Sequence, residues 1–129
     1  MILADTSAWV EFLRGTSSQA NVRLRELLDG DAIATTDVVL MELLAGARDD
    51  RHRDALRGLL ARCEFTPTDG PRDYEAAAEL YRACRRAGRT VRALTDCLIA
   101  SVAIRSGVAL LHANADFDTL ARYTPLETA

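Results

Sequence analysis

Short apolar runs alternate along the chain with longer segments in which apolar residues recur at helical spacing. The clearest runs are residues 2–4, 32–34 and 108–111, and weaker ones lie at 65–67 and 123–126. Continuous apolar runs of this length are typical of strands buried on both faces of a sheet. The alternation predicts an α/β fold, a three-layer sandwich with a central, mostly parallel sheet flanked by helices.

The segments between these strands predict amphipathic helices with recognisable ends. A helix is expected directly after Asp5, and a long one begins at Pro71, which is tolerated in a first turn, and ends at Gly88. Thr95 is expected to cap a strongly apolar helix that ends at Gly107. No repeat, linker or low-complexity tract interrupts the pattern, so we expect one domain over residues 1–129.

Composition removes several classes of chemistry. All 16 basic residues are arginine, so a P-loop and a Schiff base, which both need lysine, are excluded. The three cysteines form no C-x-x-C pair, which argues against a zinc site or a disulfide framework. No apolar run is long enough to span a membrane, and no signal peptide is recognisable at the start. We therefore expect a cytoplasmic protein with no membrane partner.

Four acidic residues occupy unusual places in this pattern. Asp5 and Asp116 follow predicted strands, Asp96 lies in the first turn of an apolar helix, and Glu42 interrupts another. Each has a simpler interpretation: Asp5 can favour a helix start through the helix dipole, and Glu42 can lie on a solvated face. In a parallel sheet, however, strand tips and helix starts share one edge, where ligands bind. The four carboxylates are therefore expected to meet there.

Carboxylates held close together repel one another and stay ionised only beside a cation. A site made of carboxylate oxygens suits Mg²⁺ or Mn²⁺ rather than zinc or copper. Such an ion lowers the pKa of bound water and holds a phosphate oxygen. The predicted chemistry is metal-assisted hydrolysis of a phosphodiester.

Four motifs in this order resemble those of a known family. They are ILADTSAW at residues 2–9, MELLAG at 41–46, TDCLIA at 95–100 and HANADFD at 112–118. The chain resembles the PIN-domain ribonucleases over nearly its full length, and most closely the VapC toxins of bacterial toxin–antitoxin pairs. Each motif is weak alone, and the set is specific.

The resemblance implies roles for particular residues. Asp5, Glu42 and Asp96 would be catalytic, metal-site carboxylates, and Asp116 the fourth, although many relatives carry an acid where Asn114 stands here. Asn114 would be a ligand or a group that supports one, and Ser7 would orient the cluster. The resemblance also implies an endoribonuclease acting on structured RNA with Mg²⁺ or Mn²⁺. It further implies a homodimer and a cognate VapB-type antitoxin that places a cationic group near the acids.

A cluster of arginines lies at the end of the long helix and in the loop beyond it. Cations favour a helix C-terminus without any partner, but five arginines in eleven residues also suit a phosphate backbone. We predict that four of them contact RNA: Arg85, Arg86, Arg89 and Arg92.

Two other functions remain open at this point. An aspartate-based phosphatase would share the acidic sheet edge, but it usually needs a lysine and a second aspartate at position 7. A PIN module that binds RNA or protein without cutting is the other alternative, and Asn114 in place of an acid gives it some weight.

Overall fold

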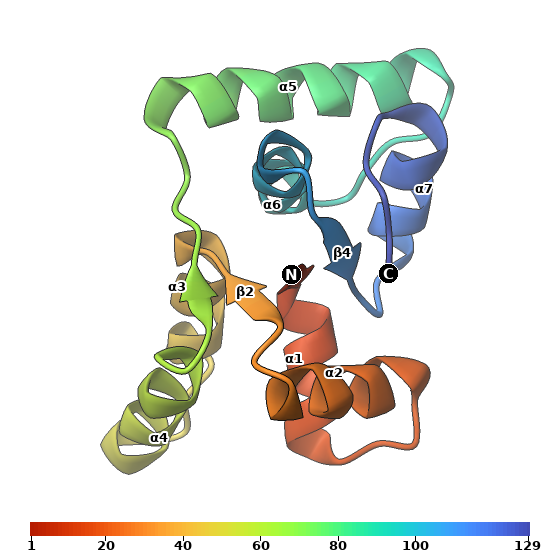
Figure 1. Ribbon diagram of the computed structural model, residues 1–129. Helices are drawn as coiled ribbons and strands as arrows, with labels where there is room; N and C mark the ends of the chain where they lie inside the picture. The colour runs from red at the N-terminus through yellow and green to blue at the C-terminus, as the bar shows by residue number, and fades with distance from the viewer.

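The computed structural model describes residues 1–129 and contains a four-stranded parallel sheet with the strand order β3–β2–β1–β4 (Figure 1). The strands are β1 (Ile2–Ala4), β2 (Ile33–Thr35), β3 (Glu64–Phe65) and β4 (Ala109–Leu111). In the central strand, Leu3 pairs with Ala34 on one side and with Leu110 on the other. The predicted parallel sheet is confirmed, with β1 and its Asp5 tip at the centre.

Seven helices flank the sheet. They are α1 (Thr6–Arg14), α2 (Gln19–Asp29), α3 (Asp37–Ala45), α4 (Asp50–Leu60), α5 (Gly70–Arg86), α6 (Leu94–Ser106) and α7 (Ala115–Tyr123). In Figure 1, α5 and α6 lie together on one side of the sheet, and α1 and α2 lie together on the other. This confirms the predicted three-layer arrangement. None of the helices has the length and the apolar composition that would be needed to cross a lipid bilayer.

Helix α6 forms the centre of the core. Eight consecutive residues, from Asp96 to Ala103, are buried, as expected of a helix that is apolar on all sides. Leu3 of β1 and Leu110 of β4 are fully buried beside it. The acid in the first turn of α6 is therefore mounted on the most buried helix of the protein.

Two local predictions are wrong, the cap of α6 and the last strand. Thr95 does not cap α6, because the helix begins one residue earlier and its N-cap, Ala93, offers no side-chain acceptor. Residues 123–126 do not form a strand, because α7 continues to Tyr123. The Thr124 hydroxyl then donates to the Leu120 carbonyl and accepts from the Leu126 N–H, which turns the chain, and a single bridge to Leu110 forms only at Thr128.

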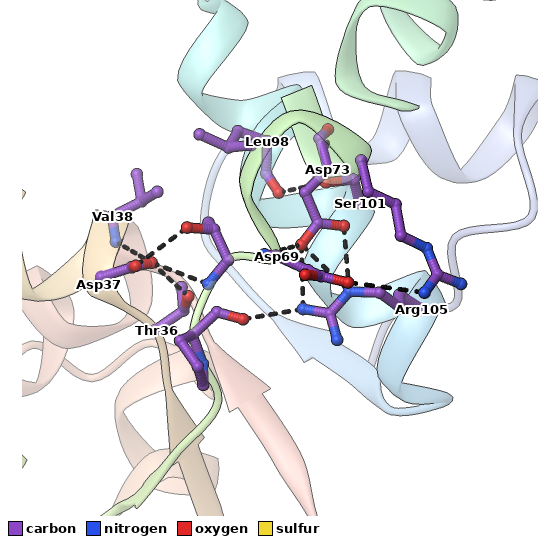
Figure 2. A network of polar contacts seen from close by, with 11 residues as sticks. Thr36, Asp37, Val38, Asp69, Asp73, Leu98, Ser101 and Arg105 are labelled. Carbon is purple, nitrogen blue, oxygen red and sulfur yellow. Dashed lines mark hydrogen bonds and ion pairs between the residues drawn. The ribbon is translucent and has the colours of Figure 1, made fainter. Parts of the chain in front are cut away.

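The link between β3 and α5 is tied to the start of α3. Asp37, the first residue of α3, accepts hydrogen bonds from the Thr68 N–H (3.2 Å) and from the Thr68 hydroxyl (2.9 Å). These bonds hold the pKa of the Asp37 carboxyl below its usual value, against the opposing effect of burial. Figure 2 shows Asp37 at the centre of this contact.

The same link is tied to α6 by a buried ion pair (Figure 2). Asp73 of α5 is 1% exposed and accepts hydrogen bonds from Arg105 Nε (3.1 Å) and from the Asp69 N–H (2.7 Å). Its Oδ2 also lies 2.9 Å from Arg105 Nη2. Arg105 Nη2 also donates to the Pro67 carbonyl at 2.8 Å. The link thus fixes α3 relative to α6.

We predict that Asp73→Asn lowers the free energy of unfolding by about 2 kcal/mol, because charge-assisted hydrogen bonds are worth roughly 1.5–3 kcal/mol and the Arg105 guanidinium would lose its partner. Urea denaturation measures the change. Asp69→Asn is the matched control, since its carboxylate makes one exposed ion pair, with Arg72 at 3.5 Å, and acts on the pKa of Arg105 only as the last of several causes, so that it should cost less than about 0.5 kcal/mol. Equal urea midpoints for the two variants would contradict the importance of this ion pair.

Candidate active site

Asp5 lies where β1 ends and α1 begins, and it is 2% exposed. Its Oδ2 accepts hydrogen bonds from the Ser7 N–H (2.8 Å) and from the Ser7 hydroxyl (2.5 Å), so Asp5 is the N-cap of α1. The interpretation of Asp5 as a residue that favours the start of a helix is therefore correct, but it accounts for only one of the two carboxylate oxygens. Its other oxygen, Oδ1, is buried without any hydrogen-bond partner, and this atom is left for another function.

Ser7 connects the two central strand tips. While its hydroxyl donates to Asp5, the same oxygen accepts from the Ala113 N–H, directly after β4, at 2.9 Å. The side chain therefore fixes both the rotation of the Asp5 carboxylate and the start of the loop that carries Asn114. This geometry agrees with the orienting role expected for Ser7.

Glu42 comes from α3 and is half-buried, so it does not lie on a fully solvated face. Its Oε1 accepts a hydrogen bond from the Thr6 hydroxyl of α1 at 2.9 Å. Thr6 was not predicted as a site residue, although its position directly after Asp5 is a signal that could have identified it. The contact brings the carboxylate of α3 to the helix that begins at Asp5.

Asp96, Asn114 and Asp116 form the other half of the cluster. Asn114 Nδ2 donates to Asp96 Oδ2 at 3.1 Å, while Asn114 Oδ1 accepts from the Asp116 N–H at 3.0 Å and caps α7. The amide thus supports two acids at once and fits a residue that positions its neighbours. Asp96 and Asp116 are both 6% exposed, and their carboxyl groups lie close enough for Asp116 to raise the pKa of Asp96.

The electrostatics place Asp5, Glu42 and Asp116 within range of Asp96, and Asp5 within range of Glu42. Burial, the contact with Asp116 and the charges of Asp5, Asp116 and Glu42 raise the pKa of the Asp96 carboxyl to about 7. Burial also raises the pKa of Asp5, against the opposing hydrogen bonds from Ser7. Burial and the charge of Asp5 raise the pKa of Glu42. The structure therefore brings together the four acids that the sequence singled out.

No three of these side chains are arranged as a ready set of metal ligands, because they pair with each other and with nearby hydroxyl and amide donors. The donor set nevertheless fits a hard divalent cation. Four carboxyl groups supply only oxygen ligands, the buried Asp5 Oδ1 lacks any partner, and a cation would offset the repulsion that raises the Asp96 pKa. Asp5, Glu42, Asp96 and Asp116 are the residues that would hold it.

The predicted arginines lie at different distances from this cluster. The Arg92 N–H donates to Asp116 Oδ2 at 3.2 Å and its Nε lies 3.5 Å from Asp116 Oδ1, so Arg92 is part of the site. Arg85 packs over the Tyr81 ring at 5.8 Å. Arg86 and Arg89 are exposed and form no ion pair.

His112 supports the loop before α7. Its Nδ1 accepts the Asn114 N–H at 3.2 Å, and its ring packs on Phe117 at 5.3 Å between centroids. These contacts agree with a structural role.

The raised pKa of Asp96 predicts how stability depends on pH. A carboxyl with a higher pKa in the folded state than in the unfolded state makes the protein less stable as the pH rises from about 4 to about 7. In EDTA, the melting temperature should therefore be lower at pH 8 than at pH 5, and Asp96→Asn should weaken this dependence. Above pH 7, Mg²⁺ should stabilise the original protein more than the variant. Identical pH profiles for both proteins in EDTA would contradict the assignment.

Comparisons with known proteins identify the family of this chain. A family model described as PIN domain matches residues 2–123. Ribonuclease VapC11 from Mycobacterium tuberculosis is 49% identical over 131 aligned positions, covering 100% of this chain and 98% of that protein. Ribonuclease VapC32 from the same species is 34% identical over 110 positions, covering 85% of this chain and 82% of that protein.

Solved structures show the same fold. The structure of VapBC2 from Rickettsia felis, bound to a DNA fragment from its promoter, superimposes with a TM-score of 0.77 at 23% identity, covering 100% of this chain and 98% of that one. VapBC-5 from Mycobacterium tuberculosis, a member of the VapBC family of toxin–antitoxin systems, gives a TM-score of 0.65 at 29% identity, covering 98% and 94%. With its family match and these relatives, the chain belongs to the PIN-domain family, and within that family it is similar to the VapC ribonucleases.

Proposed function

We propose that this protein is a metal-dependent endoribonuclease, the toxin of a type II toxin–antitoxin pair, which hydrolyses phosphodiester bonds in structured RNA in the cytoplasm. The observation that carries the proposal is the convergence of four carboxyl groups at the tips of β1 and β4, with one buried oxygen of Asp5 free. The 49% identity to VapC11, which is described as a ribonuclease, supports the choice of RNA as substrate.

The cofactor in this proposal is Mg²⁺ or Mn²⁺, held by Asp5, Glu42, Asp96 and Asp116. When bound, such an ion lowers the pKa of a coordinated water and neutralises charge on a phosphate oxygen. Ser7 keeps the Asp5 carboxylate in one rotation, Thr6 holds Glu42, and Asn114 sets Asp96 against Asp116. These hydrogen bonds preorganise the acids, which is what precise placement of a water and a phosphate requires.

Asp5→Asn and Asp96→Asn should each reduce RNA cleavage at least about 100-fold, because each removes a charged oxygen from the proposed metal site. The assay follows tRNA and rRNA fragments on denaturing gels with Mg²⁺, with Mn²⁺ and with EDTA. Asp29→Asn, an exposed acid at the end of α2, is the charge-matched control and should cleave normally. Cleavage that persists in both site variants, or in EDTA, would contradict the proposal.

A PIN module that binds RNA without cutting it is the second candidate. It is favoured by one observation, that no three acids are arranged for immediate metal ligation. RNA binding without cleavage in either metal, at any concentration of the original protein, would favour this function instead.

We also propose that the arginines in the last turn of α5 and in the loop after it bind the RNA backbone. Arg85→Ala, Arg86→Ala and Arg89→Ala combined should weaken RNA binding and lower its salt slope by about 2, since each phosphate contact contributes roughly 0.7–0.9. Fluorescence anisotropy at several salt concentrations measures both. The control variant replaces three arginines elsewhere on the surface with alanine: Arg23 of α2, Arg57 of α4 and Arg62, which lies just after α4. A salt slope equal to that of the control would show that the cluster is only surface charge.

We further propose that the protein has two kinds of protein partner, a second copy of the chain and a VapB-type antitoxin. The solved VapBC complexes support the antitoxin, and a cationic side chain from it near Asp5 and Asp96 would neutralise the same acids as a metal.

Three large apolar side chains, Met41, Tyr74 and Leu94, are more than half exposed and are candidates for the homodimer contact. Co-expression with the adjacent gene, followed by light scattering, gives the stoichiometry of the complex, and a 1:1 complex with one toxin copy would contradict the dimer.

A further inference from the structure

A pocket of about 360 Å³ opens beside the acid cluster, between α1 and the α3–α4 pair. Thr6 and Glu42, which are hydrogen-bonded to each other, both line it. The pocket is therefore continuous with the proposed catalytic site. Neither the mechanism nor the arginine cluster beyond α5 uses it, and its volume is that of a small-molecule site.

One wall of the pocket is apolar. It is formed by Val10 and Leu13 of α1 and by Leu43 and Leu56 of α3 and α4. Leu13 remains 43% exposed, whereas Leu56 is buried and supports the wall from within. A nucleobase is a flat, weakly polar group that can cover such a surface, since proteins hold bases that have left the stack between apolar as well as aromatic side chains.

Two arginines that form no ion pair also line the pocket. Of the 16 arginines, seven lie within 4 Å of a carboxylate, but Arg14 and Arg48 are not among them. Their guanidinium groups are therefore free to bind an anion, and a phosphate matches their planar donor geometry. Glu42 is the one acidic residue in the lining.

His52 adds a further donor to the same pocket. Its Nδ1 accepts the Arg48 N–H at 3.1 Å, so in the neutral ring the proton is on Nε2. This hydrogen bond also fixes the backbone at Arg48, at the turn before α4. The lining thus combines an apolar wall with three donors for an anion, immediately next to the acids.

We propose that this pocket holds one nucleotide next to the scissile bond of the RNA substrate, with its base against the apolar wall and its phosphate on Arg14 and Arg48. The proposal rests on the proposed nuclease function and adds to it a subsite for the substrate. Charge favours a polyanion as occupant, because the lining holds two unpaired guanidinium groups and a histidine against a single carboxylate, Glu42.

The test measures binding rather than cleavage. The probe is a fluorescein-labelled 12-nucleotide RNA of mixed sequence, and all proteins carry Asp5→Asn so that the strand stays intact. Adding Arg14→Ala and Arg48→Ala should weaken binding at least about 10-fold and lower the salt slope by roughly 0.7, for the loss of one phosphate contact on a single strand. The control adds Arg23→Ala and Arg62→Ala, which remove the same charge elsewhere and should change affinity less than about 2-fold.

A second variant tests the apolar wall separately. Leu13→Ser should weaken binding of the RNA with no change in salt slope, and it should have no effect on a probe of the same length that consists of abasic ribose phosphates. Val22→Ser, at an exposed apolar position of α2 that lies outside the pocket, is the matched control. Thermal unfolding verifies that each variant is folded.

Three results would overturn the nucleotide pocket. The first is that the Arg14/Arg48 double variant and the Arg23/Arg62 control bind the RNA with equal affinity. The second is that Leu13→Ser weakens binding of the intact and the abasic strand equally. The third is that the protein does not bind the RNA at 50 mM salt. If the pocket double variant binds RNA like its control but no longer co-purifies with the antitoxin, the pocket belongs to a protein segment instead. Persistent cleavage by Asp5→Asn and Asp96→Asn would overturn the proposed function by a separate readout.

Discussion

Repulsion between carboxylates at one edge of the sheet is the constraint on which the rest of this structure depends. Asp5, Glu42, Asp96 and Asp116 come from four separate positions in the sequence and lie close enough to raise the pKa of Asp96 to about 7. Hydroxyl and amide donors from Thr6, Ser7 and Asn114 offset part of this cost. They leave one buried oxygen of Asp5, Oδ1, without a hydrogen-bond partner.

The surrounding fold holds these groups in place against that repulsion. Asp5 is fixed at the tip of the central strand, and Asp96 is fixed on the most buried helix. The position of Glu42 depends on how α3 sits relative to α6. The link between β3 and α5 sets it, through Asp37 on one side and the Asp73–Arg105 ion pair on the other. A charge pair far from the acids therefore contributes to their geometry.

The parts of the structure that follow from local patterns were predictable from the sequence. The apolar runs before Asp5 and before His112 identify β1 and β4, and parallel pairing then places the acids on one edge. The position of Glu42 was also interpretable, because an isolated acid in an apolar helix needs a partner. The assignment of metal ligands among these acids stays a prediction.

Features that depend on helix boundaries or on long-range contacts were not predictable. The role of Asn114 as the cap of α7 depends on where that helix begins, and its bond to Asp96 joins residues 18 positions apart. The tail after Tyr123 follows the Thr124 turn rather than its apolar residues. The pocket beside Glu42 joins α1 to α4, and no local pattern indicates that Arg14 and Arg48 line the same cavity.

The burial of helix α6 has a consequence for how such a protein is controlled. Because Asp96 is carried by the centre of the core, its position is set when the core packs and does not depend on a surface loop. In the proposed function, control of the toxin would then lie outside the fold, in the rate of its synthesis, in its degradation, or in the supply of a molecule that occupies the acids.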